Sequence, residues 1–473
     1  MGSLASPASE GDGLHSPQEE DHSLNRALVG IPLSHDLEAT TTGKSEEYEP
    51  SGTWFHAAFH TVTAVVGVGV LGLPYAFSYL GWFFGLLLLV GTAAVSLYTS
   101  HLLAHMHEDE CGTRHCRYQD LGKAVFGKRW GAWAIVPSQF SVMIGLAVTY
   151  TVTAGQSLQA IHDTDCNDHI STSSEGREGR ACRAAFCGWV LLFGALQLAL
   201  SQIRNFDDLW WVSLLGATMS AMYSTIAFVA SAASGRSSTA DYSLRPGTTA
   251  DQVFGIMNSL GTIMFAYGGH AVLLEIQATL AAPPKVAHSM MKGVYAAYVV
   301  VCLAYFPVAI AGFAAFGNAV YPDVLLSVEN PSWLISLANF MVVIHIAASY
   351  QVFSQPVFEV IESSIADGGW RLADRPHLMR GIVRSLYVLG TTIVALLLPF
   401  FADLMGFIGA TGFTPMTFIL PSILYIKSER PTGFKLWLNV VIVAVFVILG
   451  LLAGVGSVRQ IAVHAKNYHI LAI

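Results

Sequence analysis

Apolar stretches of about the length of a membrane span recur along the chain from Thr53 onward, separated by short polar segments. No segment shows the ten-residue alternation of a membrane barrel strand. Helices satisfy their own backbone hydrogen bonds in lipid, so the pattern predicts an all-α integral membrane protein with a membrane domain over residues 51–460. The eleven predicted transmembrane helices lie at about 53–80, 81–106, 131–160, 184–203, 209–233, 253–280, 293–316, 332–361, 381–399, 403–426 and 436–460.

The charges gather outside these spans. Residues 1–50 hold ten acidic and two basic residues, which accounts for the whole net charge of −8. This segment is rich in Ser, Gly and Pro and has no apolar period, so we expect a disordered acidic tail. It contains no charged region followed by an apolar stretch, so no cleaved signal peptide is predicted. The remaining chain is electrically balanced, which excludes a basic nucleic-acid-binding face.

The basic residues also predict an orientation. With eleven spans and an inside N-terminus, 17 of the 24 Lys and Arg residues fall in inner segments. The N-terminus is therefore expected in the cytoplasm, and residues 461–473 are expected to form a short extracellular tail. Cys166 and Cys182 share one outer loop, where a disulfide could form and persist. Cys111 and Cys116 share an inner loop that we interpret as solvated rather than as a zinc site.

The first span carries an unusual run of glycines. Gly67–Gly72 matches a dinucleotide-binding pattern in letters, but no strand precedes it and Pro74 follows at once. Three glycines and a proline weaken a helix, and unwound backbone is tolerated at membrane depth only where protein covers it or it lines a cavity. We therefore interpret the run as a helix break. A small-residue face for helix packing is the alternative.

The sixth span repeats this anomaly, because Phe265–His270 places a Gly pair and a His near its middle. Spans one and six are five helices apart, which is the offset of a 5+5 inverted repeat. Paired interruptions at matching positions indicate a transporter substrate site. Helix N-termini there would bind a carboxylate and freed carbonyls an ammonium group, so the predicted substrate is an α-amino acid.

Ionisable residues inside spans are costly and indicate function. Glu275 and His270, just beyond the second break, are the candidates for proton coupling. The alternative is that Glu275 caps a neighbouring helix or pairs with a cation. Asp403 is interpreted as a boundary residue of span ten. His56 and His60 share a helical face but lack the Glu of a zinc protease, so no metal site and no enzyme is predicted.

Several ordered blocks resemble the amino acid/auxin permease family, most closely the plant lysine/histidine-type amino acid permeases. The blocks are Trp54–His60, Gly69–Ala76, Phe265–His270, Glu275–Thr279, Cys302–Ala309, Phe316–Asn318, Val343–His345, Ser349–Val352 and Pro356–Phe358. The resemblance covers most of residues 52–460. It implies a leucine-transporter-type fold with broken helices one and six, and proton-coupled symport of amino acids across the plasma membrane.

Substrate contacts are expected around the two breaks. The predicted substrate-binding residues are Val66, Gly67, Gly69, Val70, Tyr267, Gly268, Gly269 and His270. Gly268–His270 is similar to the auxin-carrier version of the motif, whereas Glu275–Thr279 is similar to the amino acid permease version. Auxin is therefore the alternative substrate, and a transport-inactive amino acid sensor is the alternative of another class. Protons are the only coupling ion expected, without a cofactor, and lipid and substrate are the expected partners.

Overall fold

The structure, a computed structural model, describes residues 51–108, 113–172, 186–203, 210–238, 240–282, 285–328 and 330–468. Within these ranges nine helices are long and apolar enough to cross a membrane, and Phe186–Ser201 is a shorter apolar helix. The all-α membrane architecture is thereby confirmed. The predicted tail over residues 1–50, Cys111, and the side chains of the predicted Cys166–Cys182 disulfide lie outside the described residues.

The first five passes run from α3 to α8. The first pass consists of α3 (Trp54–Val65) and the beginning of α4 (Gly69–Met106). It ends at Gly81, whose φ of 69° and ψ of 178° interrupt α4 and begin the second pass. Glycine adopts a positive φ without steric cost. The short helix α5 (Tyr118–Phe126) precedes the next three passes, which are α6 (Lys128–Thr172), α7 (Phe186–Ser201) and α8 (Trp210–Ser234).

The next five passes mirror this order. The sixth pass consists of α9 (Thr249–Ala266), the 3₁₀ turn η2 (His270–Val272) and α10 (Leu273–Ala278). The later elements are α11 (Val286–Phe316), η3 (Gly317–Ala319), η4 (Val324–Ser327), α12 (Ser332–Asp367), α13 (Pro376–Leu397), α14 (Phe401–Ile408), η5 (Gly409–Ile419), α15 (Leu420–Glu429) and the eleventh pass α16 (Gly433–Asn467). The predicted breaks in passes one and six are both present, five helices apart. Some ends differ from the sequence prediction, since α11 begins seven residues earlier than expected.

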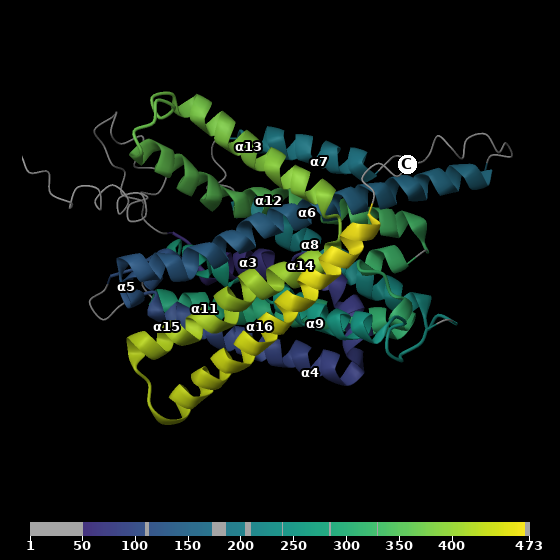
Figure 1. The fold of residues 1–473 in the computed structure, drawn as a ribbon, viewed down its shortest axis with the longest axis horizontal. Helices are drawn as coiled ribbons and strands as arrows, with labels where there is room; N and C mark the ends of the chain where they lie inside the picture. The colour runs from purple at the N-terminus through teal and green to yellow at the C-terminus, as the bar shows by residue number, and fades with distance from the viewer. Residues whose placement is uncertain are drawn as a thin grey trace, which may run out of the picture.

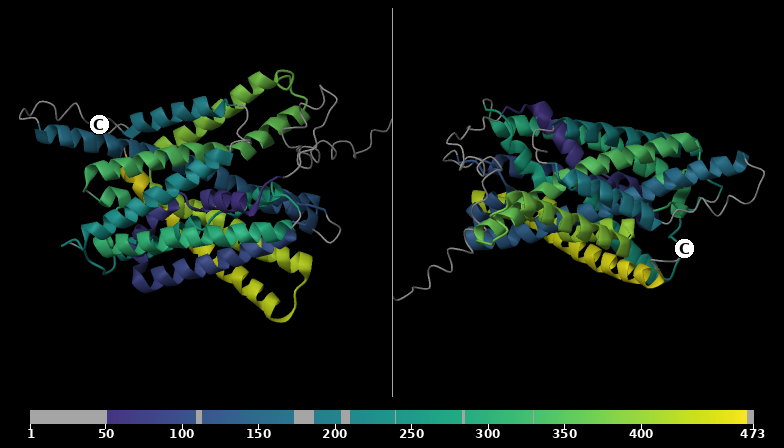
Figure 2. Two further views of the ribbon diagram at one scale, coloured as in Figure 1. Left: turned by 180° about the vertical axis from the view of Figure 1, so that it is seen from behind. Right: turned by 90° about the horizontal axis from the view of Figure 1, so that it is seen from above.

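The passes form one bundle, with their ends gathered at two faces (Figures 1 and 2). We call the face at which α3 begins, and near which α5 lies, the N-side face, and the other the opposite face. In the interior α6 packs against α12, α11 against α3 and α4, and α9 against α4 and α16. The first and sixth passes are therefore surrounded by protein, and one hydrophobic core spans both.

Close backbone contact sets the position of the tenth pass. A Cβ atom on Gly261 of α9 would lie 2.2 Å from the carbonyl oxygen of Gly406 on α14. The following segment, η5, is π-helical and contains Pro415, which cannot donate a backbone hydrogen bond. The Thr414 hydroxyl donates to the Gly409 carbonyl five residues earlier, at 2.6 Å. Small residues thus let α9 and the tenth pass approach as closely as two backbones can.

A pair of backbone hydrogen bonds joins the start of the first pass to the end of the sixth. The N–H of Gly52 donates to the carbonyl of Thr279 at 2.9 Å, and the N–H of Ala281 donates to the carbonyl of Gly52 at 2.9 Å. This short parallel bridge lies at the N-side face. It holds α3 and α10 together at their outer ends.

Candidate functional site at two helix breaks

The first break lies between α3 and α4. α3 ends at Val65, the following Val66 has a φ of −81° and a ψ of 81°, and α4 begins at Gly69. The N–H of Gly67 donates to the carbonyl of Val65 at 2.9 Å instead of continuing the helical pattern. Two β-branched residues and two glycines have low helix propensity, so this sequence breaks the helix readily.

The second break lies between α9 and η2. α9 ends at Ala266, the following Tyr267 has a φ of −95° and a ψ of 13°, and His270 begins the next helical turn. The N–H of Gly268 donates to the carbonyl of Phe265 at 3.1 Å. The carbonyl of Tyr267 accepts a hydrogen bond from the Ser96 hydroxyl of α4 at 3.2 Å. The Gly pair at 268 and 269 lowers helix propensity here as the glycines do in the first break.

The two breaks are in direct contact. A Cβ atom on Gly69 would lie 3.1 Å from the Cα atom of Ala266, and one on Gly269 would lie 2.5 Å from Cγ2 of Val65. Glycine at these positions allows the two passes to cross at their interruptions. The structure thus brings together the two groups that sequence reasoning selected, Val66, Gly67, Gly69 and Val70 with Tyr267, Gly268, Gly269 and His270. Their role as contacts for a bound molecule stays a prediction.

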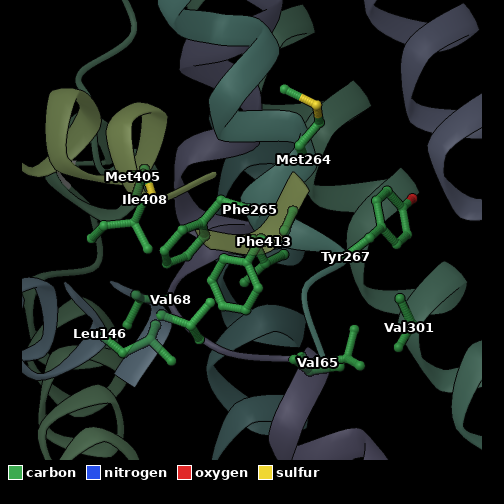
Figure 3. Close-up of a cluster of buried hydrophobic side chains, with 14 of the residues drawn as sticks. Val65, Val68, Leu146, Met264, Phe265, Tyr267, Val301, Met405, Ile408 and Phe413 are labelled. Atoms are coloured by element: carbon green, nitrogen blue, oxygen red, sulfur yellow. The ribbon is translucent and has the colours of Figure 1, made fainter. Parts of the chain in front are cut away.

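Aromatic and aliphatic side chains surround the crossing (Figure 3). Phe413 of η5 stacks edge-on against Phe265 of α9, with ring centroids 5.1 Å apart. A Cβ atom on Gly268 would lie 1.9 Å from the Phe413 ring, so the ring occupies the place of a side chain at 268. Polar groups at the crossing are therefore mainly backbone groups in an apolar surrounding, where electrostatic interactions are stronger than in water.

Tyr150 of α6 is a residue of this site that sequence reasoning missed. A Cβ atom on Gly67 would have the Tyr150 hydroxyl, at 3.6 Å, as its nearest neighbour. The Tyr150 ring is buried and faces Phe353 of α12 with centroids 6.5 Å apart. A hydroxyl near unpacked backbone can donate to an anionic group. Nothing in the third span distinguishes Tyr150 from a packing aromatic residue until the bundle places it beside Gly67.

His270 is the first residue of η2, directly after the second break, and is 1% exposed. Its Nε2 atom is 3.1 Å from the carbonyl oxygen of Ser96 and within 3.1 Å of the hydroxyls of Thr99 and Ser100. Because a carbonyl only accepts, Nε2 is assigned the proton. Nδ1 has no hydrogen-bond partner among the described residues, and neither does the buried Thr61 hydroxyl.

Both unpartnered groups line one small cavity. Thr61 and His270 border an enclosed space of about 10 Å³, together with Val65, Ser100, Gly269, Leu273, Ile276 and Tyr298. That volume is roughly the minimum for one water molecule. Nδ1 of the neutral imidazole carries a lone pair.

Glu275 lies further along the same pass, toward the N-side face. Its carboxyl group lies near the backbone of Tyr118, the first residue of α5, and interacts with the charged side chains of Arg117 and Asp120. Oε2 is buried without a hydrogen-bond partner in the described part of the chain. Glu275 thus lies beside the first turn of α5, the helix that the capping alternative would involve. No hydrogen bond between Glu275 and His270 is seen among the described residues.

Two polar clusters lie nearer the opposite face. Asp403 of α14 is 3% exposed and hydrogen-bonded to the half-exposed His464 of α16, a contact that its interpretation as a boundary residue did not include. Arg245, in the connection before α9, donates to the Ser78 hydroxyl at 3.0 Å and to the Val320 carbonyl at 3.2 Å. Its guanidinium also lies 4.7 Å from the centroid of the Tyr75 ring. Arg245 thus ties α4 to the segment after α11.

The described ranges hold no group of three or more His, Cys, Asp or Glu side chains arranged to bind a metal. The Nδ1 atom of His56 accepts the backbone N–H of Thr53 at 3.1 Å. His56 therefore takes part in the cap of α3.

Residues 50–463 match the family model of the transmembrane amino acid transporter proteins. The chain belongs to this family. It is 40% identical over 465 residues to the lysine histidine transporter-like 1 protein of Arabidopsis thaliana, covering 97% of this chain and 98% of that protein. GABA transporter 1 of the same plant is 34% identical, covering 92% and 96%. Amino acid permease 2 is 31% identical, covering 88% and 89%.

The bundle is also similar to a solved structure, MhsT in complex with L-phenylalanine. The TM-score is 0.51 at 14% identity, and the match covers 87% of this chain and 100% of that chain. At this identity the likeness establishes the fold alone. The transporter thus has the leucine-transporter-type 5+5 inverted repeat, with the two breaks at the centre of the bundle.

Proposed function

We propose that this chain is a secondary active transporter that moves amino acids together with protons by alternating access. The contact between two helix breaks, in a chain of the amino acid transporter family, carries this proposal. The first turn of a helix leaves N–H groups unpaired and the last turn leaves carbonyl groups unpaired. With the helix dipoles, these groups suit the carboxylate and the ammonium group of an α-amino acid.

The substrate would lie against the backbone of residues 66–70 and 267–269, beside His270. The Tyr150 hydroxyl next to Gly67 would add a donor for the substrate carboxylate. Lysine and histidine, or a broader set of amino acids, are favoured over auxin because curated relatives are named lysine histidine transporter-like proteins and amino acid permeases. A competition panel of unlabelled amino acids and indole-acetate in proteoliposomes tests this. Competition by indole-acetate alone would contradict it.

We further propose that the N-side face is cytoplasmic and that the protein lies in the plasma membrane. The excess of Lys and Arg in segments at this face supports the orientation. Protease or impermeant-label access to tags at the two termini of the protein in intact cells tests it. A C-terminal tag reached only after permeabilisation would reverse the assignment.

Protons would be taken up and released by His270 and Glu275. Both lie in the pass that contains the second break, both have a buried unpartnered atom, and Glu275 lies toward the proposed cytoplasmic face. Glu275→Gln is expected to abolish concentrative uptake while retaining exchange of labelled for unlabelled substrate, because a neutral amide cannot carry the proton. The assay is uptake into proteoliposomes with an imposed proton gradient.

The matched control is Asp120→Asn, which removes the neighbouring carboxylate on α5 and should leave accumulation in place. Full accumulation by Glu275→Gln would clear Glu275 of this role. Wild-type uptake that is indifferent to an alkaline outside solution would refute proton coupling as a whole.

A further inference from the structure

The ends of α3 and α9 that precede the two breaks meet at one side chain. The hydroxyl of Tyr305, on α11, lies 2.6 Å from the carbonyl oxygen of Val65 and 2.7 Å from the carbonyl oxygen of Ala266. Val65 and Ala266 are the last residues of the two half-helices. The Tyr305 side chain is fully buried. One hydroxyl therefore joins both breaks.

These two carbonyls are unusual acceptors. Each belongs to the last turn of a helix, where carbonyls lose their helical partners and the helix dipole concentrates negative charge. In transporters with broken helices, such half-helix ends and unwound carbonyls are the groups that coordinate a coupling cation. A small cation would suit two carbonyl oxygens that converge on one point.

The Tyr305 hydroxyl, a neutral donor, lies between the two carbonyl oxygens. Its single proton is shared by both carbonyls, and this hydrogen bonding allows the three oxygens to lie close together. The titratable side chains that interact with Tyr305, none of which is a carboxylate, are Tyr298, Tyr150, Tyr223, Tyr267 and Cys302. The ring is held edge-on against Tyr267, with centroids 5.3 Å apart. Sequence comparison placed Tyr305 in a matching block without giving it a role.

We propose that the Tyr305 hydroxyl takes the place of a coupling cation such as Na⁺ between the two half-helix ends and makes the transporter independent of sodium. Tyr305 is then a positioning residue. It fixes the ends of α3 and α9 relative to each other for substrate binding and does not itself carry the transported proton. This inference rests on the proposed transport function. It adds an explanation of why sodium would not take part in transport.

The test compares Tyr305→Phe with wild type in proteoliposomes, with external Na⁺ replaced by choline at constant ionic strength. Wild type should show the same KM in both solutions. In choline the variant should show a KM raised about tenfold, because the two buried carbonyls lose the hydroxyl that joins them and Val65 keeps only the Gly67 N–H. Sodium should lower this KM again, since the phenyl ring leaves the two oxygens open to the ion. A variant with wild-type KM, or one impaired equally in both solutions, overturns the proposal.

The matched control is Tyr223→Phe. Tyr223 of α8 is as deeply buried as Tyr305, and its hydroxyl has no partner among the described residues. This variant should keep the KM of wild type and its indifference to sodium. If it instead acquired the sodium response of Tyr305→Phe, the response would not come from the two carbonyls and the proposal would fail.

A second measurement does not depend on how the variant folds. The melting temperature of the wild-type protein in nanodiscs should be the same in Na⁺ and in choline, and a specific rise in Na⁺ would show that the wild type binds sodium and contradict its proposed independence of this ion. Failure of the proposed function is distinct, because it would appear as wild type that does not accumulate amino acids under a proton gradient.

Discussion

At the scale of the residue, Gly67 and Gly268 are important at the breaks because of the room that a missing side chain leaves. Neither needs a positive φ. Gly268 is covered by the Phe413 ring, which would lie 1.9 Å from an added Cβ atom. Gly67 has only the Tyr150 hydroxyl nearby, at 3.6 Å. Two residues that look alike in the sequence therefore differ in whether their vacant side is packed or open.

This difference predicts opposite outcomes for the same substitution. Gly268→Ala should lower the free energy of unfolding by about 1–3 kcal/mol and reduce uptake, because Phe413 must move out of a packed core. Gly67→Ala should leave the unfolding free energy unchanged and raise the KM, because the methyl group enters the proposed substrate space. Thermal unfolding and labelled uptake measure the two effects. Equal stability of the two variants would contradict the packing argument.

At the scale of the element, the connection between α11 and α12 contains a buried carboxylate. Asp323 is 1% exposed and accepts the backbone N–H of Leu325 at 2.9 Å, which caps the short helix η4. Burial raises the pKa of Asp323 to about 6 from its ordinary 3.8. By contrast, hydrogen bonds from Ser243 lower the pKa of the exposed Asp241 in the connection before α9.

The raised pKa of Asp323 predicts a pH-dependent stability. The folded protein binds this proton more tightly than the unfolded chain, so stability present at low pH is lost as the pH rises from about 4 to about 6. Asp323→Asn should therefore raise the melting temperature above about pH 6 and leave it unchanged near the lower limit. The shift corresponds to at most about 3 kcal/mol. Melting curves in nanodiscs across this range measure it.

Asp241→Asn is the control for that experiment. Its carboxylate is stabilised by hydrogen bonds in the charged form, so its neutral replacement should not raise the melting temperature at neutral pH. If Asp323→Asn behaved like Asp241→Asn, the burial of Asp323 would not govern the pH dependence.

At the scale of the whole molecule, the net charge of −8 belongs entirely to residues 1–50, of which only Pro50 falls within the family match over residues 50–463. The membrane domain is electrically balanced and contains both breaks. We therefore predict that deletion of residues 1–50 leaves the KM and the concentrative uptake of the transporter unchanged. A sensor that signals through this segment would instead keep amino acid binding and lose its cellular output. Substrate uptake and binding of the truncated protein distinguish the two.

Much of this organisation could be predicted from the sequence, because a bilayer imposes the length of spans and glycine marks the breaks. Eleven passes, the 5+5 repeat and the two interruptions follow from periodicity and from Gly67, Gly69, Gly268 and Gly269. What could not be predicted depends on which helices become neighbours. Tyr150, Tyr305 and Arg245 carry no local signal, since an aromatic residue in a span or a cation in a loop has many uses. Only the packing of α6, α11 and the connection before α9 assigns them to the breaks and their surroundings.

The bridge between Gly52 and the segment after α10 has a consequence for the speed of transport. In the proposed alternating-access cycle, opening of the N-side face would move α3 away from the bundle, and two backbone hydrogen bonds link the start of α3 to Thr279 and Ala281. Breaking both would add about 1–3 kcal/mol to the barrier. If α3 and α10 instead move together as one unit, with bending at the two breaks, neither hydrogen bond is lost. The turnover rate is then limited by the change of backbone conformation at the two breaks and not by the loss of the hydrogen bonds between Gly52 and the segment after α10.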